Sequence, residues 1–144
     1  MKLTPHFTLA ELTATSTGLD NTPNKKVRAN LRALCAACAE PLRMKIGRMK
    51  VTSGYRSEAV NKAVGGSAKS QHMKGEAMDF VPLDVPLAEA VQALTINLEA
   101  GFPFDQIIVY PDRGFIHISH TDSRENRREM LEFSDGKYLP YNEG

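Results

Sequence analysis

Apolar side chains at helical spacing mark two long segments of this chain. In residues 22–42 they recur every three or four positions, at Val27, Leu31, Leu34, Cys35, Cys38 and Leu42. This spacing predicts a helix with one apolar face, which Thr22-Pro23 opens and which Pro41 ends or kinks. Residues 84–100 repeat the pattern, with Gly101 as the expected stop and with apolar positions at Leu87, Val91, Leu94 and Leu98.

A shorter helix is predicted near the start of the chain by its capping residues. Thr8 is the expected N-cap, and Glu11 stands at the third helical position, where the two residues form a capping box. Phe7 and Leu12 stand where a hydrophobic staple would close over the first turn. A further short helix is expected over residues 56–63.

Short apolar runs bounded by turn residues predict a set of strands. They cover residues 49–54, 76–81, 106–110, 115–119, 129–133 and 137–139. The run Pro111-Asp-Arg-Gly114 suits a hairpin turn, and Ser134-Asp-Gly136 suits another. Because strands and helices mix without regular alternation, we expect one α+β domain over residues 1–144. It should have a small, mainly antiparallel sheet with helices packed on one side.

The composition indicates a soluble globular protein and excludes some partners. The chain has 144 residues, of which 42% are hydrophobic and 24% charged. A formal net charge of +1 gives no electrostatic reason to expect a nucleic acid or an anionic membrane as partner. No segment has the apolar length that spans a bilayer, and the first residues carry no apolar signal core. We therefore expect a monomer made in the cytoplasm without a signal peptide.

Cys35 and Cys38 are the two cysteines of the chain, and both lie within the apolar helical pattern. Their spacing is compatible with a redox pair or with half of a metal site. A structural zinc site would need a second pair of ligands, however. Because free cysteine is among the most buried residue types, we expect two reduced thiols in the core.

Two histidines stand out as candidate metal ligands. His72 lies in the run Ser70-Gln-His-Met-Lys-Gly-Glu-Ala-Met-Asp79, in a loop just before a predicted strand. His117 lies in the middle of the strand Phe115-Ile-His-Ile-Ser119. Side chains alternate between the two faces of a strand, so the two isoleucines should face the core and His117 the opposite side.

Asp79 is the third candidate ligand. A carboxylate in the middle of an apolar strand is costly to bury unless a cation or hydrogen bonds compensate its charge. Two imidazoles and one carboxylate hold zinc and leave a fourth position for water, as in catalytic sites. The spacing alone leaves another interpretation open, in which the histidines are ordinary core or surface residues and the aspartate caps a turn or pairs with arginine.

A series of short motifs runs through most of the chain. They are Ser53-Gly-Tyr-Arg-Ser57, Asn61, Val64-Gly-Gly66, Ser70-Gln-His72, Gly75-Glu-Ala77, Asp79, Phe104-Asp-Gln106 and Phe115-Ile-His-Ile-Ser119. Together they resemble the zinc D-Ala-D-Ala carboxypeptidase and endolysin family of peptidoglycan peptidases, in particular its compact form common in bacteriophages and prophages. The wider superfamily includes D-alanyl-D-alanine dipeptidases and the hedgehog signalling domain, so the resemblance implies a fold of that kind.

The resemblance also implies roles for individual residues. It implies that His72, Asp79 and His117 bind Zn²⁺. It implies that Arg56 polarises or anchors a substrate carbonyl or carboxylate, for which a planar guanidinium is suited; a structural ion pair is the alternative. Ser70 matches a family serine that contacts substrate or orients the loop, and the alternative is a hydrogen bond within the loop.

The chain departs from the family pattern just before the last zinc histidine. Many relatives carry a catalytic glutamate or aspartate there, but the position three residues before that histidine is Gly114. Tyr110 stands where compact relatives often have glutamate, and we expect it to contact substrate as a donor to the oxyanion. Asp112 is the expected general base, with Asp105 as second choice or as a strand-end cap. His120 is expected to contact substrate or to support the site.

The resemblance implies zinc-dependent hydrolysis of an amide bond in the peptidoglycan stem peptide, of the D-Ala-D-Ala carboxypeptidase or L-Ala-D-Glu endopeptidase type. A phage or prophage lysin, released to the wall or carried on the virion, fits a chain without a signal segment. Two alternatives stay open. One is a non-catalytic zinc-containing virion or wall-binding module, and the other is a cytoplasmic D-Ala-D-Ala dipeptidase.

Overall fold

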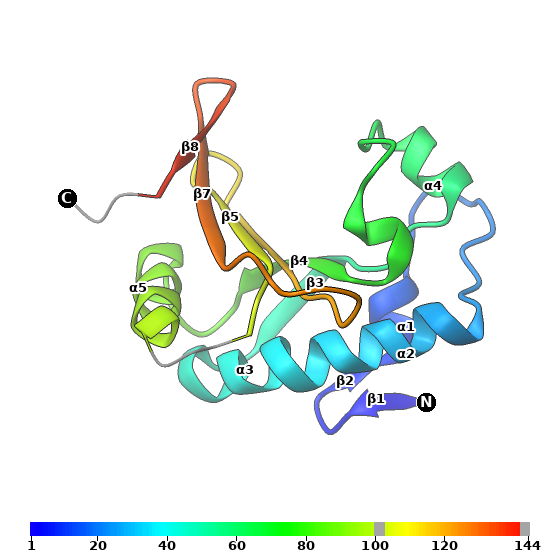
Figure 1. Cartoon of the computed structure of the whole chain (residues 1–144), viewed down its shortest axis with the longest axis horizontal. Coiled ribbons are helices and arrows are strands. Elements are labelled where there is room, and N and C mark those ends of the chain that lie inside the picture. Colours follow the sequence, from blue (N-terminus) through cyan, green and yellow to red (C-terminus); the bar gives the residue numbers. More distant parts are fainter. Residues whose placement is uncertain (100–102, 142–144) are drawn as a thin grey trace.

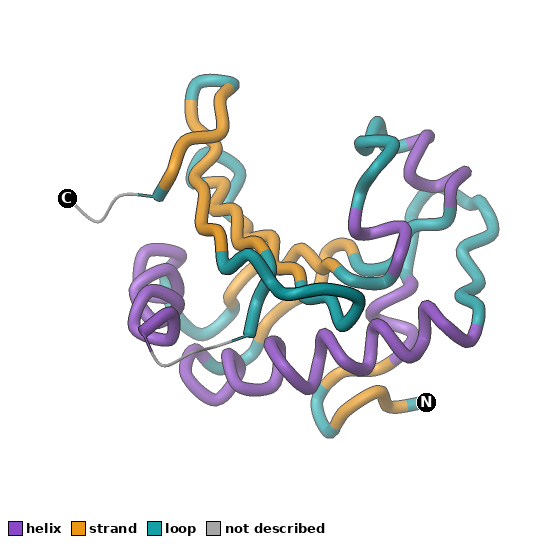
Figure 2. Tube along the Cα trace, viewed as in Figure 1, coloured by secondary structure: helices purple, strands orange, loops and turns teal. Residues whose placement is uncertain are grey.

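The centre of the molecule is a twisted sheet of six strands in the order β3-β4-β6-β5-β7-β8 (Figures 1 and 2). The computed structural model describes residues 1–99 and 103–141. Neighbouring strands run antiparallel except β5 and β7, which are parallel. The strands are β3 (Met49–Ser53), β4 (Ala77–Pro82), β5 (Gln106–Tyr110), β6 (Phe115–Ser119), β7 (Glu129–Ser134) and β8 (Lys137–Pro140). The predicted α+β fold with a mainly antiparallel sheet is confirmed.

The helices and a small second sheet complete the fold. The second sheet pairs β1 (Lys2–Thr4) with β2 (Phe7–Thr8), and the sequence pattern did not predict it. The helical segments are α1 (Leu9–Thr13), α2 (Lys25–Leu34), the π-helix η1 (Cys35–Ala39), α3 (Glu40–Ile46), α4 (Glu58–Ala63), the 3₁₀ helix η2 (Gln71–Lys74) and α5 (Leu87–Glu99). No helix in the described residues is long and apolar enough to cross a membrane.

The core lies between one face of the sheet and the run α2–η1–α3, with α5 beside α3 (Figure 1). Met78 and Phe80 of β4 and Ile116 and Ile118 of β6 are fully buried in it. The predicted alternation is therefore observed, since the residues between them in sequence point to the other face. That other face carries the candidate site.

The capping box at the start of α1 is present as predicted. The Thr8 side chain accepts a hydrogen bond from the backbone N–H of Glu11, and the Glu11 carboxylate accepts one from the backbone N–H of Thr8, both at 3.1 Å. Phe7 and Leu12 on either side of the cap are buried. Two otherwise unpaired backbone donors of the first turn are thereby satisfied.

The boundaries of the second helix differ from the prediction. It begins at Lys25 rather than at Thr22-Pro23, because the Asn24 side chain accepts a hydrogen bond from the N–H of Val27 at 2.8 Å and caps it. Pro41 does not end it. The π-helical turn η1 ends at Ala39, and Pro41 lies in the first turn of α3, where a missing N–H is tolerated.

The helix predicted over residues 84–100 begins three residues later, at Leu87. Asp84 is held outside it by Arg48, whose backbone N–H and guanidinium both donate to the Asp84 carboxylate. Ala100 and the expected stop at Gly101 lie outside the described residues.

Cys35 and Cys38 are free thiols, and both are fully buried, as predicted. Burial raises the pKa of the Cys35 thiol to about 12, and the pKa of Cys38 is raised for the same reason. Because the thiolate is the reactive form, neither thiol is poised for redox chemistry at neutral pH, and neither belongs to the metal-ligand group found among the described residues.

Gly75 sets how closely η2 approaches α2, and its replacement tests that packing. It has φ of +71°, and a Cβ there would lie 2.8 Å from the Val27 carbonyl oxygen. We expect Gly75→Ala to lower the free energy of unfolding by more than about 1 kcal/mol in urea denaturation. The backbone strain at positive φ and the close contact of the new Cβ would both destabilise the folded state. Gly65→Ala is the control, since Gly65 has φ of +74° but open space around it. Equal losses in the two variants would contradict the packing argument.

Candidate active site

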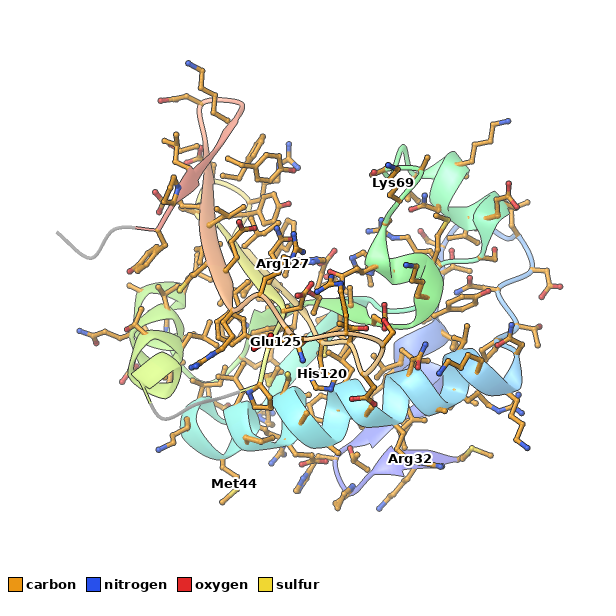
Figure 3. All side chains as sticks on the ribbon, in the orientation of Figure 1. Arg32, Met44, Lys69, His120, Glu125 and Arg127 are labelled. Atoms are coloured by element: carbon orange, nitrogen blue, oxygen red, sulfur yellow. The ribbon has the colours of Figure 1, made fainter. Side chains whose placement is uncertain are left out.

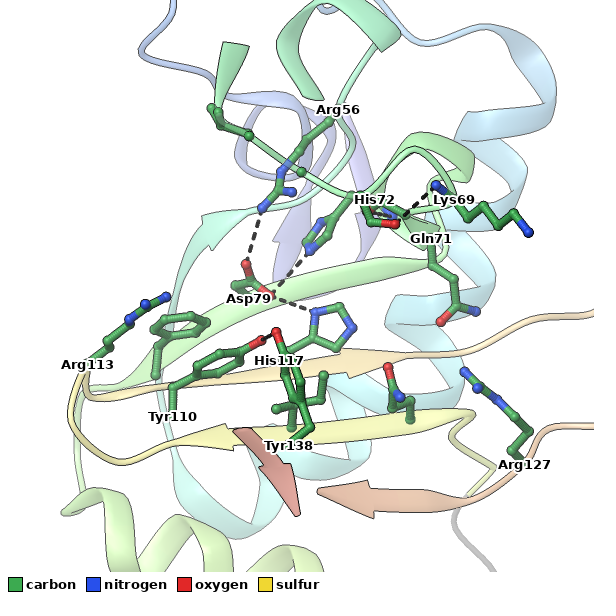
Figure 4. Close-up of a pocket in the computed structure, with 18 residues that line it drawn as sticks. Arg56, Lys69, Gln71, His72, Asp79, Tyr110, Arg113, His117, Arg127 and Tyr138 are labelled. Atoms are coloured by element: carbon green, nitrogen blue, oxygen red, sulfur yellow. Dashed lines mark hydrogen bonds and ion pairs between the residues drawn. The ribbon is translucent and has the colours of Figure 1, made fainter. Parts of the chain in front are cut away.

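His72, Asp79 and His117 converge on the face of the sheet opposite the core (Figure 4). Asp79 on β4 and His117 on β6 are directly opposite partners in the antiparallel pairing. His72 comes from η2, a 3₁₀ turn where the sequence predicted only a loop. One potential ligand atom from each residue lies within 4.8 Å of the others. The structure thus brings together the three residues that the sequence singled out as metal ligands.

Local backbone interactions hold His72 in place. The Ser70 side chain caps η2 by accepting a hydrogen bond from the His72 backbone N–H at 3.2 Å. The Gly54 carbonyl lies 2.7 Å from Nδ1 of His72. Gly54 has no side chain to separate it from α1, where a Cβ would collide with the Leu12 carbonyl. Ser70 therefore holds the backbone of His72, and Gly54 orients its ring.

This hydrogen bonding also fixes which nitrogen of His72 is free to bind a cation. A carbonyl oxygen only accepts, so Nδ1 of His72 carries a hydrogen and donates it to Gly54. In the neutral ring Nε2 presents a lone pair, and this atom lies 3.3 Å from Oδ1 of Asp79. Two acceptors at that distance repel each other. The arrangement therefore requires a cation between them, either a proton on His72 or a metal ion.

The charges of Asp79 and His117 are compatible with a metal ion as that cation. Burial would raise the pKa of the Asp79 carboxyl, but hydrogen bonds from His117 and His72 outweigh it and hold the pKa well below its usual range. Burial lowers the pKa of His117 and outweighs the opposing effect of Asp79, whose Oδ1 lies 2.8 Å from its Nδ1. An ionised carboxylate beside a neutral imidazole is the state that zinc ligands need. The donor set therefore fits a zinc ion.

Arg56 lies against this group from the loop before α4. Its Nη2 is 3.5 Å from Oδ2 of Asp79, its Nε donates to Ser53 at 3.0 Å, and its Nη1 donates to Asn61 at 3.4 Å. The ion pair expected as the alternative role is therefore present. Arg56 also lines the cleft, beside the three candidate ligands.

The three candidate ligands line a cleft of about 500 Å³. Its described lining residues include four cationic side chains, from Arg56, Lys69, Arg113 and Arg127, while Asp79 is the single carboxylate among them. Ser70 and Tyr110 also line it, as expected of substrate contacts. The cleft is therefore positively charged in the part of the chain that the structure describes, which favours an anionic ligand.

Tyr110 forms an aromatic wall at one end of the cleft (Figure 4). Its ring stacks on Phe115 at 4.3 Å between centroids, and its hydroxyl lies 3.4 Å from that of Tyr138 on β8. Burial raises the pKa of Tyr110, and Tyr138 and Asp79 add to the effect. Tyr110 is therefore a neutral hydroxyl at physiological pH and is able to donate a hydrogen bond.

Two predicted residues are not brought to the cleft. Asp112 is exposed in the β5–β6 turn and borders a separate hollow together with Arg113 and Phe133. His120 is buried, and its two ring nitrogens contact the Pro103 carbonyl and the Asp122 carboxylate. His120 therefore connects two loops, and the expectation that it contacts substrate is not supported.

Asp105 has a structural role at the start of β5. It is fully buried, and its carboxylate pairs with Arg124 at 2.8 Å and with Arg127 at 2.9 Å. It also accepts hydrogen bonds from the Arg127 backbone N–H and from the Gln71 side chain. Burial would raise the pKa of this carboxyl, but the two arginines outweigh it and lower the pKa. Asp105 thus links the segment beyond β6 to the turn that carries His72.

Sequence reasoning missed several lining residues, among them Lys69, Arg113, Arg127 and Tyr138. The turn at Ser134-Asp-Gly136 correctly predicted a hairpin, which is now β7–β8. Nothing in the sequence showed that β7 pairs in parallel with β5. That pairing is what places the hairpin beside the cleft.

An α+β fold with a buried set of two histidines and an aspartate, open to a cleft, is the architecture of a metal-dependent hydrolase. The sequence profile of the family described as Peptidase M15 matches residues 5–119, most of the chain. The chain therefore belongs to the peptidase M15 family and is a metallopeptidase of that family. The family is zinc-dependent and hydrolyses peptidoglycan peptides. No individual curated protein matches the chain significantly.

The Asp105 ion pairs predict a defined pH dependence of stability. Because the folded pKa is lowered, this carboxylate stabilises the fold above its unfolded pKa of about 4, and the contribution is lost as pH falls. We expect Asp105→Asn to lower the unfolding free energy at pH 7 by about 2–3 kcal/mol, less than a fully buried pair, because both arginines are half-exposed. The difference from the unsubstituted protein should shrink between about pH 5 and 3.

The measurement is urea denaturation at several pH values. Asp84→Asn is the control, because Asp84 pairs with Arg48 at 2.7 Å on the exposed surface. Its effect at pH 7 should be clearly smaller. A loss that is independent of pH in Asp105→Asn would show that the carboxylate charge is not what matters.

Proposed function

We propose that this protein hydrolyses an amide bond in the stem peptide of bacterial peptidoglycan, with zinc held by His72, Asp79 and His117. The observation that carries the proposal is the convergence of these three side chains beside the cleft, with one potential ligand atom from each lying within 4.8 Å of the others. A bound zinc ion polarises a carbonyl and lowers the pKa of bound water to about 7. The bond is of the D-Ala-D-Ala carboxypeptidase or the L-Ala-D-Glu endopeptidase type.

The side chains around the ligands have distinct tasks in this proposal. Gly54 keeps the hydrogen of His72 on Nδ1, so that Nε2 stays available. Arg56 donates to the substrate carbonyl and stabilises negative charge on its oxygen, a contribution of about 3–4 kcal/mol for such donors elsewhere. Ser70 holds η2 in position and borders the substrate.

Proton transfer has two proposed participants. Asp112 is the proposed general base, which requires the β5–β6 turn to approach the cleft when substrate binds; catalytic contacts often tighten only in the complex. Tyr110 is the proposed donor to the oxyanion, and its neutral hydroxyl in the cleft supports that role. The two roles are compatible with each other.

We further propose that the protein is a phage or prophage lysin. It would be made in the host cytoplasm and act on the wall after release, or as part of the virion. The support is the resemblance to the compact peptidases common in phages. Its partner in this proposal is the stem peptide.

A second candidate function is a zinc-containing wall-binding module without catalytic activity. One observation favours it: Asp79 is the only carboxylate among the described lining residues of the cleft, so a second carboxylate to accept the water proton is missing there. Such a module would keep the metal and the cationic cleft and would bind stem peptides without cleaving them.

The central experiment measures zinc content and cleavage of purified peptidoglycan. We expect about one zinc per chain, chelator-sensitive loss of turbidity, and stem-peptide fragments whose masses identify the bond. His117→Ala should lose zinc, activity and part of the thermal stability, because bound metal stabilises only the folded state. Zinc with peptide binding but no cleavage would favour the binding module, and cleavage of free D-Ala-D-Ala alone would favour a dipeptidase. Unchanged activity in His117→Ala would exclude the zinc hydrolase.

Two conservative substitutions separate the proposed proton-transfer roles. Tyr110→Phe should lower kcat by about 100-fold with little change in KM, because a donor to the transition state is lost. Asp112→Asn should lower kcat by about 100-fold or more if this carboxylate is the base. A change of less than about twofold in Asp112→Asn would remove that assignment. Steady-state kinetics on a soluble stem peptide provides the measurement, with zinc content verified for each variant.

A further inference from the structure

One end of the cleft is built by a segment beyond the region that defines the family. The family match ends at Ser119, while Arg127 lies in the segment between β6 and β7 and lines the cleft. Lys69, Gln71 and Arg127 occupy this end, and Tyr110 and Arg113 the other, with the ligands between them (Figure 4). In Figure 3, Lys69 projects from the segment between α4 and η2, and Arg127 from the segment between β6 and β7.

Asp105 fixes the orientation of Arg127. Nε of Arg127 lies 3.3 Å from both carboxylate oxygens, and Nη2 lies 2.9 Å from Oδ2. The backbone N–H of Arg127 donates to the same carboxylate at 2.8 Å. These bonds use Nε and Nη2, so the hydrogens of Nη1 lie outside the ion pair. The ion pair therefore fixes one edge of the guanidinium. The Arg127 side chain is still 48% exposed.

The charge around Arg127 combines arginines with carboxylates. Arg124 and Arg127 share the Asp105 carboxylate, and Glu76 acts on Arg124 in addition, so the positive charge at this end of the cleft comes from the lining residues Lys69 and Arg127. The Glu129 carboxylate is nearby and accepts a hydrogen bond from Gln106, but it is not among the lining residues. A fixed guanidinium with spare donors beside a cleft is suited to bind a carboxylate.

We propose that Arg127, positioned by Asp105, binds a free carboxylate of the substrate next to the bond that is cleaved. The inference rests on the proposed function and makes the protein selective for an acidic peptide. A stem peptide offers this group in two places: the α-carboxylate of a D-glutamate linked through its side chain, and the C-terminal carboxylate. Amidation removes the charge of either one without changing the length of the peptide.

Arg124 provides a matched control for Arg127. It pairs with the same Asp105 carboxylate, through Nη1 at 2.8 Å and Nη2 at 3.0 Å, and its side chain is also 48% exposed. Arg124 does not line the cleft. Loss of either arginine removes one partner of Asp105, so a purely structural role would give the two variants similar effects.

The experiment compares Arg127→Gln and Arg124→Gln in the zinc-loaded full-length protein. The substrates are a stem peptide with both carboxylates free, one amidated at D-glutamate, and one amidated at the C-terminus. Arg127→Gln should raise KM by about 10- to 100-fold on the free peptide, as expected for loss of a charge-assisted hydrogen bond. It should have no effect beyond about twofold on the peptide that lacks the carboxylate bound by Arg127. The amidated peptide on which Arg127→Gln has no effect shows which of the two carboxylates Arg127 binds.

Arg124→Gln should leave this selectivity unchanged, and Arg127→Lys should restore part of the affinity because it keeps the positive charge. The inference is overturned if Arg127→Gln raises KM equally on all three peptides. It is also overturned if Arg124→Gln raises KM only on the peptides that keep the carboxylate. Calorimetric measurement of the binding of the same peptides tests the role of Arg127 separately from the proposed hydrolysis. Carboxylate-dependent binding through Arg127 without cleavage would support the inference and contradict the hydrolase proposal. Cleavage at the same rate with and without amidation would support the hydrolase proposal and contradict the inference.

Discussion

The architecture depends on keeping one ionised carboxylate, Asp79, inside the sheet. A buried charge of this kind is costly unless its surroundings compensate for it. Antiparallel pairing sets His117 directly opposite, η2 adds His72 from above, and Arg56 approaches the second oxygen. On the opposite face of the same two strands, Met78, Phe80, Ile116 and Ile118 are buried in the core and anchor β4 and β6 there. The core and the metal centre are thus two faces of the same pair of strands.

Much of this was readable from the sequence because it depends on short-range patterns. Alternation along β6 predicted that His117 turns away from the core, and the unusual Asp79 in an apolar strand predicted a compensating cation or hydrogen bonds. The capping box at Thr8 was found because its signal spans only four residues, Thr8 to Glu11. Helix boundaries were less accurate, since Asn24 and the π turn before Pro41 compete with signals that are just as strong.

What the sequence did not reveal depends on contacts between distant segments. Asp105 was weighed as a base or a cap, but its partners Arg124 and Arg127 lie about twenty residues away, and no local pattern marks them. Its lowered pKa follows from those partners, so its structural role emerges only in the folded chain. The same holds for the parallel pairing of β5 with β7, which decides that Tyr138 faces the cleft.

The hairpin β7–β8 forms the outer edge of the sheet, and its attachment has a consequence for how the protein can diversify. The metal ligands belong to β4, β6 and η2, whereas the outer wall of the cleft belongs to this edge. Edge hairpins tolerate exchange better than central strands, because fewer neighbours must adjust. The metal ligands and one part of the cleft lining, Arg127 and Tyr138, therefore lie on separate parts of the chain. Substitutions after Ser119 would change this part of the lining while the central strands stay the same.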